Sequence, residues 1–208
     1  MRWSEVAVER GRDWGRRSVV PDDAPVVGSD AALADLLASG SFDRGDDAPP
    51  VVLVGGDLCR TLGGRGGARP GSEATVVEVD VGRVLVDGRI YSFVAHVVAG
   101  TLRRPGRWWV AANAAHRGRW NAAPRSHPGD GLLDLLESDL RPGEVFGAWR
   151  RLGAGIHVPH PRISAERART AAWSFPVRTP VRIDGRPPVP AREVVARLDP
   201  DDTVWVAV

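Results

Sequence analysis

The chain has 208 residues, 43% of them hydrophobic, which is enough to form a folded core in one large domain or two small ones. No stretch approaches the roughly 18 uninterrupted apolar residues of a membrane-spanning helix, and the first residues lack the apolar centre of a secretion signal, so we expect a cytoplasmic protein. The net charge is +2, all 28 basic residues are arginine, and Asp and Glu are interspersed among them, which argues against a nucleic-acid partner.

The first quarter of the chain predicts a strand, a tight turn and a helix. Residues 1–20 favour a strand or a helix that leads to a turn at 21–23. Val26 and Val27 then form a short apolar run that Gly28 ends, and leucines at helical spacing predict a helix that reaches residue 38. Ser29 or Asp30 is suited to cap that helix.

The same pattern repeats after a loop at 39–50. Residues 51–54 are a continuous apolar run, residues 55–57 (GGD) break it, and residues 58–62 begin a short helix. Two such units predict a parallel α/β layer. Cys59, the single cysteine, cannot form an internal disulfide and is expected to be a small buried thiol.

From residue 75 onward the chain is rich in short β-branched runs. Asp87 and Gly88 stand between two of them, at 76–86 and from 90, and predict a hairpin. One helix is predicted at 142–152, opened by Pro142. This part predicts an antiparallel sandwich, so we divide the chain into domains 1–74 and 75–208. Further strands are expected at 90–98, 108–112, 170–175, 181–183, 193–198 and 203–208.

The two glycine-ending turns are candidate phosphate sites. Both place backbone N–H groups at the start of a helix, where phosphates bind, although strand-to-helix turns need glycine in proteins that bind nothing. Asp30 and Asp57 would suit such a site if Mg²⁺ bridged carboxylate and phosphate. Because the chain has no lysine, any side-chain contact to a phosphate must come from arginine or a hydroxyl.

Three other features carry weaker signals. Asp130 could hold a hard cation with neighbouring carbonyls, although an Asp-Gly turn in which the aspartate caps its own backbone is the favoured explanation. His157 and His160 lack the helical spacing of zinc ligands and favour a structural role. The eight tryptophans are expected mainly in the core, with a cleft for an acyl or aromatic ligand as the alternative.

Taken in order, several segments resemble the diacylglycerol kinase and bacterial lipid kinase family over about residues 25–208. Residues 122–124 (AAP) with 127–134 (HPGDGLLD) are similar to its AP-x-A-x-P-x-DGLLD signature. Residues 157–163 (HVPHPRI) resemble its H-x-x-HP-x-V, and 181–185 (VRIDG) the start of its v-x-v-DGE. Residues 79–84 (VDVGRV) and 56–63 (GDLCRTLG) resemble its vDlGrv and GNDLARTLG segments.

The resemblance implies an α+β fold, with a reduced α/β nucleotide-binding layer followed by a mostly antiparallel β-sandwich. It also implies ATP-dependent transfer of a phosphoryl group to a lipid hydroxyl with Mg²⁺. Asp30 and Asp184 take the catalytic positions, and the metal site maps to Asp130 with carbonyls near His127 and Leu132. The nucleotide-binding positions implied are Gly28, Ser29, Gly55, Gly56 and Asp57.

Three departures from the family pattern make a non-catalytic relative the alternative, one that binds a lipid, a nucleotide or a partner protein. The glycine-rich GGDGT loop is GSDAA at 28–32, and the glutamate base after Asp-Gly is Arg186. An arginine cannot accept a proton from the acceptor hydroxyl. The chain also begins after the family's first strand and helix, which predicts an exposed sheet edge and a homodimer. Expected partners are a nucleotide, a lipid or other apolar hydroxyl-bearing acceptor, and a membrane surface contacted peripherally.

Overall fold

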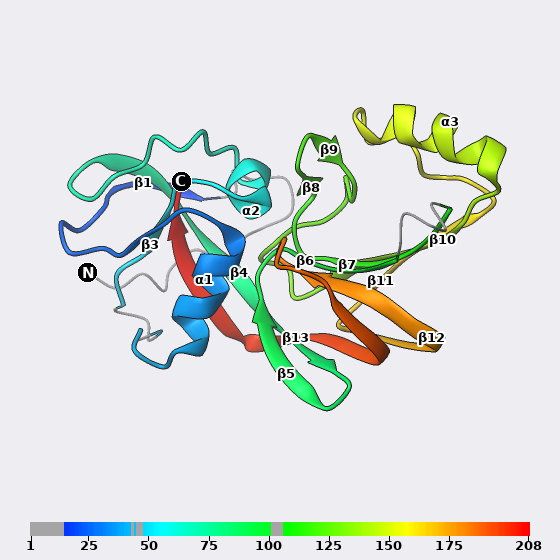
Figure 1. Ribbon diagram of the computed structural model, residues 1–208. Coiled ribbons are helices and arrows are strands. Elements are labelled where there is room, and N and C mark those ends of the chain that lie inside the picture. The colour runs from blue at the N-terminus through cyan, green and yellow to red at the C-terminus, as the bar shows by residue number, and fades with distance from the viewer. Residues whose placement is uncertain (1–14, 43, 45–47, 101–105) are drawn as a thin grey trace.

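The computed structural model describes residues 15–42, 44, 48–100 and 106–208 (Figure 1). Its helices are α1 (Asp30–Ala38), α2 (Asp57–Thr61) and α3 (Pro142–Leu152). No helix in these ranges combines the length and apolar character needed to cross a membrane. The strands are β1 (Arg16–Val19), β2 (Val26–Val27), β3 (Val51–Leu53), β4 (Glu73–Val86), β5 (Arg89–Phe93), β6 (His96–Gly100), β7 (Arg107–Ala112), β8 (His116–Arg117), β9 (Trp120–Asn121), β10 (Leu133–Asp139), β11 (Ile163–Ala168), β12 (Thr170–Ile183) and β13 (Val189–Ala207).

Most of the described strands join one sheet, in the order β1-β4-β13-β12-β6-β7-β10-β11. Neighbours along this path are antiparallel, whereas β3 pairs with β13 in parallel and β2 pairs with β3 in parallel. Strand β5 pairs with β4, and β8 and β9 form a separate hairpin. The α+β class predicted from the sequence is therefore confirmed.

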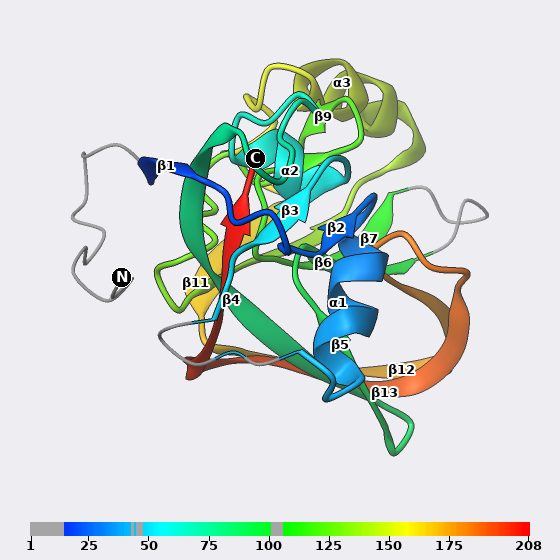
Figure 2. The same ribbon diagram turned by 90° about the vertical axis from the view of Figure 1, so that its left-hand side faces the viewer.

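The first strand-turn-helix unit forms as its sequence predicts. Ser29 is the N-cap of α1, and its side chain accepts a hydrogen bond of 3.2 Å from the Ala32 N–H. Leu33 and Leu37 on the inner side of the helix are buried. In Figure 2, α1 lies in front of the sheet and covers β5.

Strands β4 and β13 are long enough to connect the two ends of the molecule. Val77 and Val79 of β4 belong to a core cluster with Leu33 and Leu53 at the helix-bearing end. Further along the same strand, Val84 belongs to a second core cluster at the sheet-rich end. The domain division at residue 75 stays a prediction, and both ends share these two strands.

The sheet-rich end curls around its own core, as expected of a sandwich. The second core cluster draws side chains from β4, β5, β6, β7, β10, β12 and β13. Trp109 of β7 meets Phe175 of β12 edge to face, with ring centroids 4.9 Å apart. The hairpin between β4 and β5 turns at Asp87 (φ 44°) and Gly88 (φ 85°), the left-handed pair that the Asp-Gly signal predicts.

Three predicted strand boundaries differ from the structure. Residues 90–98 form two strands, β5 and β6, because the backbone leaves the ladder at Val94 and Ala95, whose N–H groups donate to the Asp184 carboxylate. The runs at 170–175 and 181–183 are one strand, β12, with a register shift between Ser174 and Thr179. The runs at 193–198 and 203–208 are likewise joined in β13 across a second register shift.

Candidate functional site

The two glycine-ending turns lie against each other. Strands β2 and β3 pair in parallel, with Val26 opposite Val52, so their carboxyl ends reach the same edge. Gly28 follows β2 and Gly55 follows β3 closely. A Cβ atom on Gly55 would lie 2.6 Å from the Gly28 carbonyl oxygen, which explains why this approach needs glycine.

Asp30 joins the first turn to the second. Its carboxylate accepts hydrogen bonds from the backbone N–H groups of Asp57 (2.6 Å) and Leu58 (3.1 Å) at the start of α2. Gly56 has a φ of 101°, and a Cβ atom there would overlap the Asp30 carboxylate. Burial raises the pKa of Asp30 to about 7, against the effect of these hydrogen bonds. Asp30 thus holds the start of α2 in place from a buried position.

Asp184 lies near Asp30 and is saturated by backbone donors. Its carboxylate accepts hydrogen bonds from the N–H groups of Val94 (2.8 Å), Ala95 (2.9 Å) and His96 (2.9 Å). Burial raises its pKa to about 6, and the three hydrogen bonds oppose that rise. This arrangement fixes the break between β5 and β6.

Arg186 connects the turn that follows β12 to helix α1. One of its guanidinium nitrogens donates to the Asp35 carboxylate (2.7 Å) and to the Ala31 carbonyl (3.0 Å). The other is 4.0 Å from the Asp184 carboxylate. At the position where the resemblance expects a base, the structure has a cation engaged by three oxygen partners.

The side chains of Asp57 and His96 lie close together beside these turns. One oxygen of Asp57 accepts a hydrogen bond of 2.5 Å from the Gly118 N–H, and the other lies 3.7 Å from His96 Nδ1. His96 Nε2 is 2.8 Å from the Ala114 carbonyl oxygen, to which it can donate. Burial lowers the pKa of His96 to about 4, although the charge of Asp57 acts in the opposite direction.

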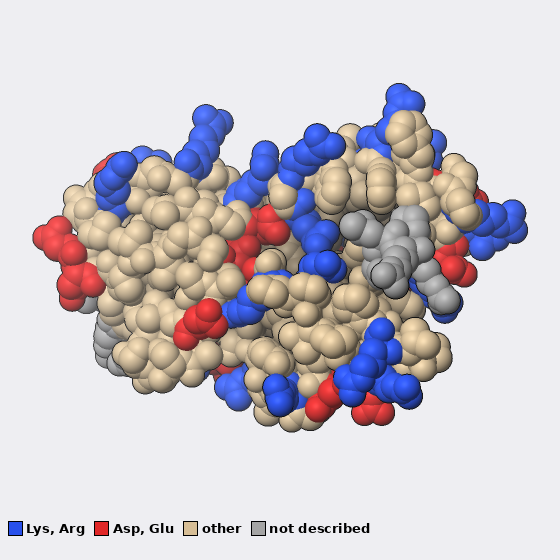
Figure 3. Space-filling view, viewed as in Figure 1, with Lys and Arg blue, Asp and Glu red and all other residues tan. Residues whose placement is uncertain are grey.

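Two polar pockets adjoin at Asp57 and Gly118. Figure 3 shows blue and red side chains gathered around the hollow in the middle of this face. The larger pocket measures 670 Å³ and the smaller 320 Å³. The larger is lined by Val54, Gly55, Gly56, Asp57, Cys59, Arg60, Gly63, Gly64, Arg65, Gly66, His116 and Gly118. The smaller is lined by Asp57, His96, Val98, Arg117, Gly118, Trp120, Arg182 and Gly185.

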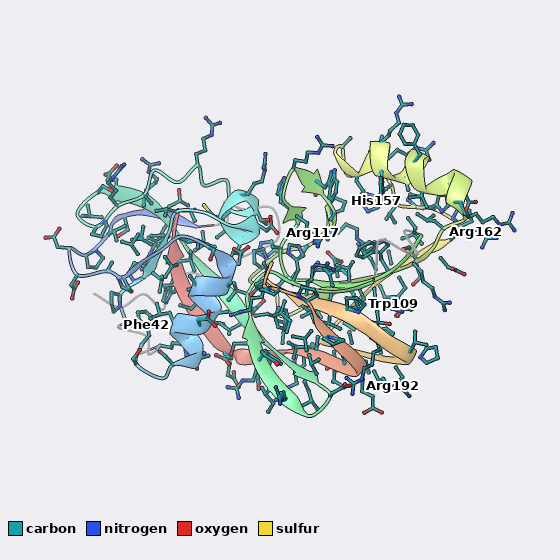
Figure 4. All side chains as sticks on the ribbon, in the orientation of Figure 1. Phe42, Trp109, Arg117, His157, Arg162 and Arg192 are labelled. Atoms are coloured by element: carbon teal, nitrogen blue, oxygen red, sulfur yellow. The ribbon has the colours of Figure 1, made fainter. Side chains whose placement is uncertain are left out.

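An apolar cavity of 340 Å³ continues from the smaller pocket and lies beneath α3. Val98, Arg117, Trp120 and Arg182 line both spaces, so these four residues form their common border. Trp108 and Trp149 line the cavity as well, whereas Trp173 is buried in the core. Of the described tryptophans only Trp173 is buried, so the expectation that most of them lie in the core is wrong for this part of the chain, and the ligand cleft stays a prediction. Figure 4 shows Arg117 facing the hollow and His157 under α3.

The segment around Asp130 is a separate site. Its oxygen atoms that could bind a metal ion accept hydrogen bonds from other groups of the protein. The Asp130 carboxylate accepts hydrogen bonds from the Leu132 N–H (3.1 Å) and from Arg167. Arg167 also lies 3.2 Å from the Asp134 carboxylate. The His127 carbonyl accepts a hydrogen bond of 3.4 Å from the Asp130 N–H.

The described side chains offer no cluster of acidic, histidine or cysteine ligands for a metal ion. None of the described His, Cys, Asp and Glu side chains form a group of three or more that could hold one. At Asp130 the positive charge is supplied by Arg167, and at Asp30 both carboxylate oxygens accept backbone N–H groups. The metal positions implied by the resemblance stay predictions.

Comparisons with known proteins identify the fold. No family model matches the chain, and no curated protein matches its sequence. A crystal structure of a candidate diacylglycerol kinase from Bacillus anthracis str. Sterne is similar with a TM-score of 0.60 and 16% identity, over 87% of this chain and 76% of that one. A second such structure from the same organism gives a TM-score of 0.59 and 13% identity, over 87% and 77%.

The chain has a diacylglycerol-kinase-like fold. At these identities the likeness is one of fold, and the match is distant.

Within this diacylglycerol-kinase-like fold, the predicted positions fall in two places. The structure brings Gly28, Ser29, Asp30, Gly55, Gly56 and Asp57 together at one edge, with Asp184 beside them. Asp130, His127 and Leu132 form the other place, where the β10–β11 pair carries Arg167.

The sequence did not point to three residues that line this fold's central hollow, namely His96, Arg117 and Arg182. They come from β6, β8 and β12, which only the folding of the whole chain brings together. Arg182 stands in a segment that resembles the family pattern, but its direction is set by the pairing with Val98 in β6. His96 and Arg117 follow no motif.

Proposed function

We propose that the protein is a lipid-binding protein built on the diacylglycerol-kinase-like fold. The supporting observation is the apolar cavity beneath α3, whose border with the polar hollow carries Arg117 and Arg182. A hydrocarbon chain buried among Val98, Leu136 and Trp149 would leave its polar end at that border.

Three features favour binding without catalysis. Arg186 replaces a base and is engaged by Asp35 and the Ala31 carbonyl. Asp184 accepts three backbone hydrogen bonds, which leaves it poorly placed to accept a proton from a substrate. The described side chains also include no group of three or more His, Cys, Asp or Glu residues that could hold a metal ion without a nucleotide.

The membrane would be the source of such a lipid. Phe146 and Trp149 on α3 are 69% and 42% exposed, next to Arg150 and Arg151 in its last turn. Exposed aromatic residues beside arginines suit a helix that lies at the surface of an anionic bilayer. In the proposed function, α3 contacts the membrane peripherally and lies over the cavity.

A cavity-filling substitution tests the proposal. The neutral, environment-sensitive dye N-phenyl-1-naphthylamine should fluoresce in the wild-type cavity and be displaced by monolaurin. Val110→Phe, which places extra volume on the cavity wall, should weaken dye binding by about tenfold or more. Val26→Phe, at an exposed position far from the cavity, should leave it unchanged. Equal binding by both variants would contradict the proposal.

A second candidate is phosphoryl transfer from ATP to a lipid hydroxyl. It is favoured by the glycine-lined pocket of 670 Å³, which adjoins the lipid side at Asp57. In this function Asp57, which lines both polar pockets, would accept the hydroxyl proton. Mg²⁺ would have to arrive with the nucleotide, because the described side chains offer no metal site of their own.

Two measurements separate the candidates. A rise in melting temperature with ATP and Mg²⁺ would show that a nucleotide binds the folded protein. Transfer of radiolabelled phosphate to extracted lipids would then demonstrate turnover. Our first proposal expects no transfer above background. Activity in Arg186→Glu but not in the wild type would assign the loss to the missing base.

A further inference from the structure

Arg117 and Arg182 are the charged side chains on the wall of the cavity beneath α3. The wall is otherwise formed mainly by apolar groups, including Val98, Trp108 and Leu136. Both arginines also line the smaller polar pocket. They therefore mark the point where an apolar ligand would have to pass from hydrocarbon surroundings to polar ones.

Neither guanidinium has a partner within the described protein. Other arginines of the chain pair with carboxylates, such as Arg167 with Asp134 and Arg186 with Asp35. The side chains of Arg117 and Arg182 form no ion pair or hydrogen bond with another described residue. Burial lowers the pKa of Arg117, Asp57 opposes this effect, and the nearby charge of Arg182 lowers the pKa further.

Two unpaired guanidinium groups of like charge at one partly buried place repel each other and lose hydration. An anion between them would offset both costs, and guanidinium groups bind carboxylates and phosphates through paired hydrogen bonds. A free anion would bind the arginines but leave the apolar walls of the adjoining cavity exposed to water. An amphiphile would satisfy the arginines and the cavity together.

Resting on the proposed lipid-binding function, we infer that the cavity binds a single-chain lipid with a phosphate or carboxylate headgroup, held by Arg117 and Arg182. The cavity volume of 340 Å³ lies at the lower end of the range of roughly 300–1,000 Å³ for ligand pockets, which favours one hydrocarbon chain over two. The headgroup then faces Asp57 and His96 only across the smaller pocket. The positive charges of the two arginines offset the repulsion between an anionic headgroup and the Asp57 carboxylate.

The test compares ligands that share a chain and differ in headgroup. The purified protein, loaded with N-phenyl-1-naphthylamine, is titrated with dodecyl phosphate, laurate or dodecanol, each below its micelle-forming concentration, and displacement of the dye is measured. We expect both anions to bind at least about tenfold more tightly than dodecanol. Arg117→Gln and Arg182→Gln should each remove most of that difference while dye and dodecanol binding persist, which also shows that the cavity remains folded.

Arg89→Gln removes the same charge from the exposed β4–β5 hairpin and should behave as wild type. Equal binding of dodecanol and dodecyl phosphate, or unchanged selectivity in both cavity variants, would overturn the inference and leave lipid binding standing. Binding of inorganic phosphate as tight as that of dodecyl phosphate would overturn it by assigning the arginines to a free anion. If neither the dye nor any amphiphile binds, the proposed function fails as well.

Discussion

At the scale of single residues, Asp30 makes the stability of the fold depend on pH. Its pKa is about 7 in the folded protein and 3.8 as an isolated group. Between these values the folded state holds a proton that the unfolded chain has released. The contribution of this group therefore falls as pH rises from about 4 to 7, by at most about 4 kcal/mol.

Asp30→Asn should flatten that dependence. The amide can accept only one of the two backbone N–H donors of Asp57 and Leu58, so the variant should be less stable at every pH. Its free energy of unfolding in urea should nevertheless decline less between pH 4 and 7 than that of the wild type. Asp23→Asn, at an exposed position, is the control. Parallel pH profiles for Asp30→Asn and wild type would refute the assignment.

Arg167 provides a second residue-scale prediction, because it supplies the positive charge at Asp130. Arg167→Met should lower the free energy of unfolding by about 1–3 kcal/mol, since it removes hydrogen bonds to Asp130 and leaves the buried Asp134 without its cation. Arg169→Met, at an exposed position, should change little. EDTA should leave the melting temperature of the wild type unchanged. A lower melting temperature in EDTA would instead indicate a bound metal ion.

At the scale of elements, the approach of α2 to α1 depends on Gly56. Gly56→Ala should cost more than Gly63→Ala, although both glycines have left-handed φ angles, 101° and 82°. The strain of a side chain at such an angle is about 1–2 kcal/mol in each variant. Only at Gly56 does the new Cβ overlap the Asp30 carboxylate, whereas Gly63 has open space around it. Urea unfolding of both variants measures the difference, and equal losses would exclude a tight contact.

The same elements show how much the sequence could predict. Local signals narrowed the cap of α1 to Ser29 or Asp30 and sufficed for the Asp87-Gly88 hairpin and α3, because each depends on neighbours in the chain. The register shifts in β12 and β13 could not be predicted, since they interrupt the alternation that identifies a strand. The parallel pattern of the two strand-turn-helix units predicted that both glycine turns lie at one edge, whereas the placement of Arg117 and Arg182 at one border depends on strands that are distant in the chain.

At the scale of the whole molecule, β4 and β13 link the two core clusters. Strand β2 pairs only with β3 among the described strands, which is consistent with an exposed sheet edge at the helix-bearing end. Dimerisation through this edge stays a prediction, and a monomeric mass by light scattering would refute it. The shared strands have a further consequence for how the protein unfolds.

Because both clusters include side chains of β4 and β13, we expect the two ends to unfold together. Leu133→Ala, in the sheet-rich cluster, should cost about 2–5 kcal/mol. Cys59 is 3% exposed at the other end, so reaction of its thiol in a urea titration reports the opening of that end. The urea midpoint for Cys59 labelling should fall in Leu133→Ala by as much as the midpoint from circular dichroism. The milder Ile183→Val, costing about 0.5–1.5 kcal/mol, should shift both midpoints less and equally. If Cys59 stayed protected while circular dichroism reported unfolding, the ends would be independent, and the predicted boundary at residue 75 would gain support over a single cooperative unit.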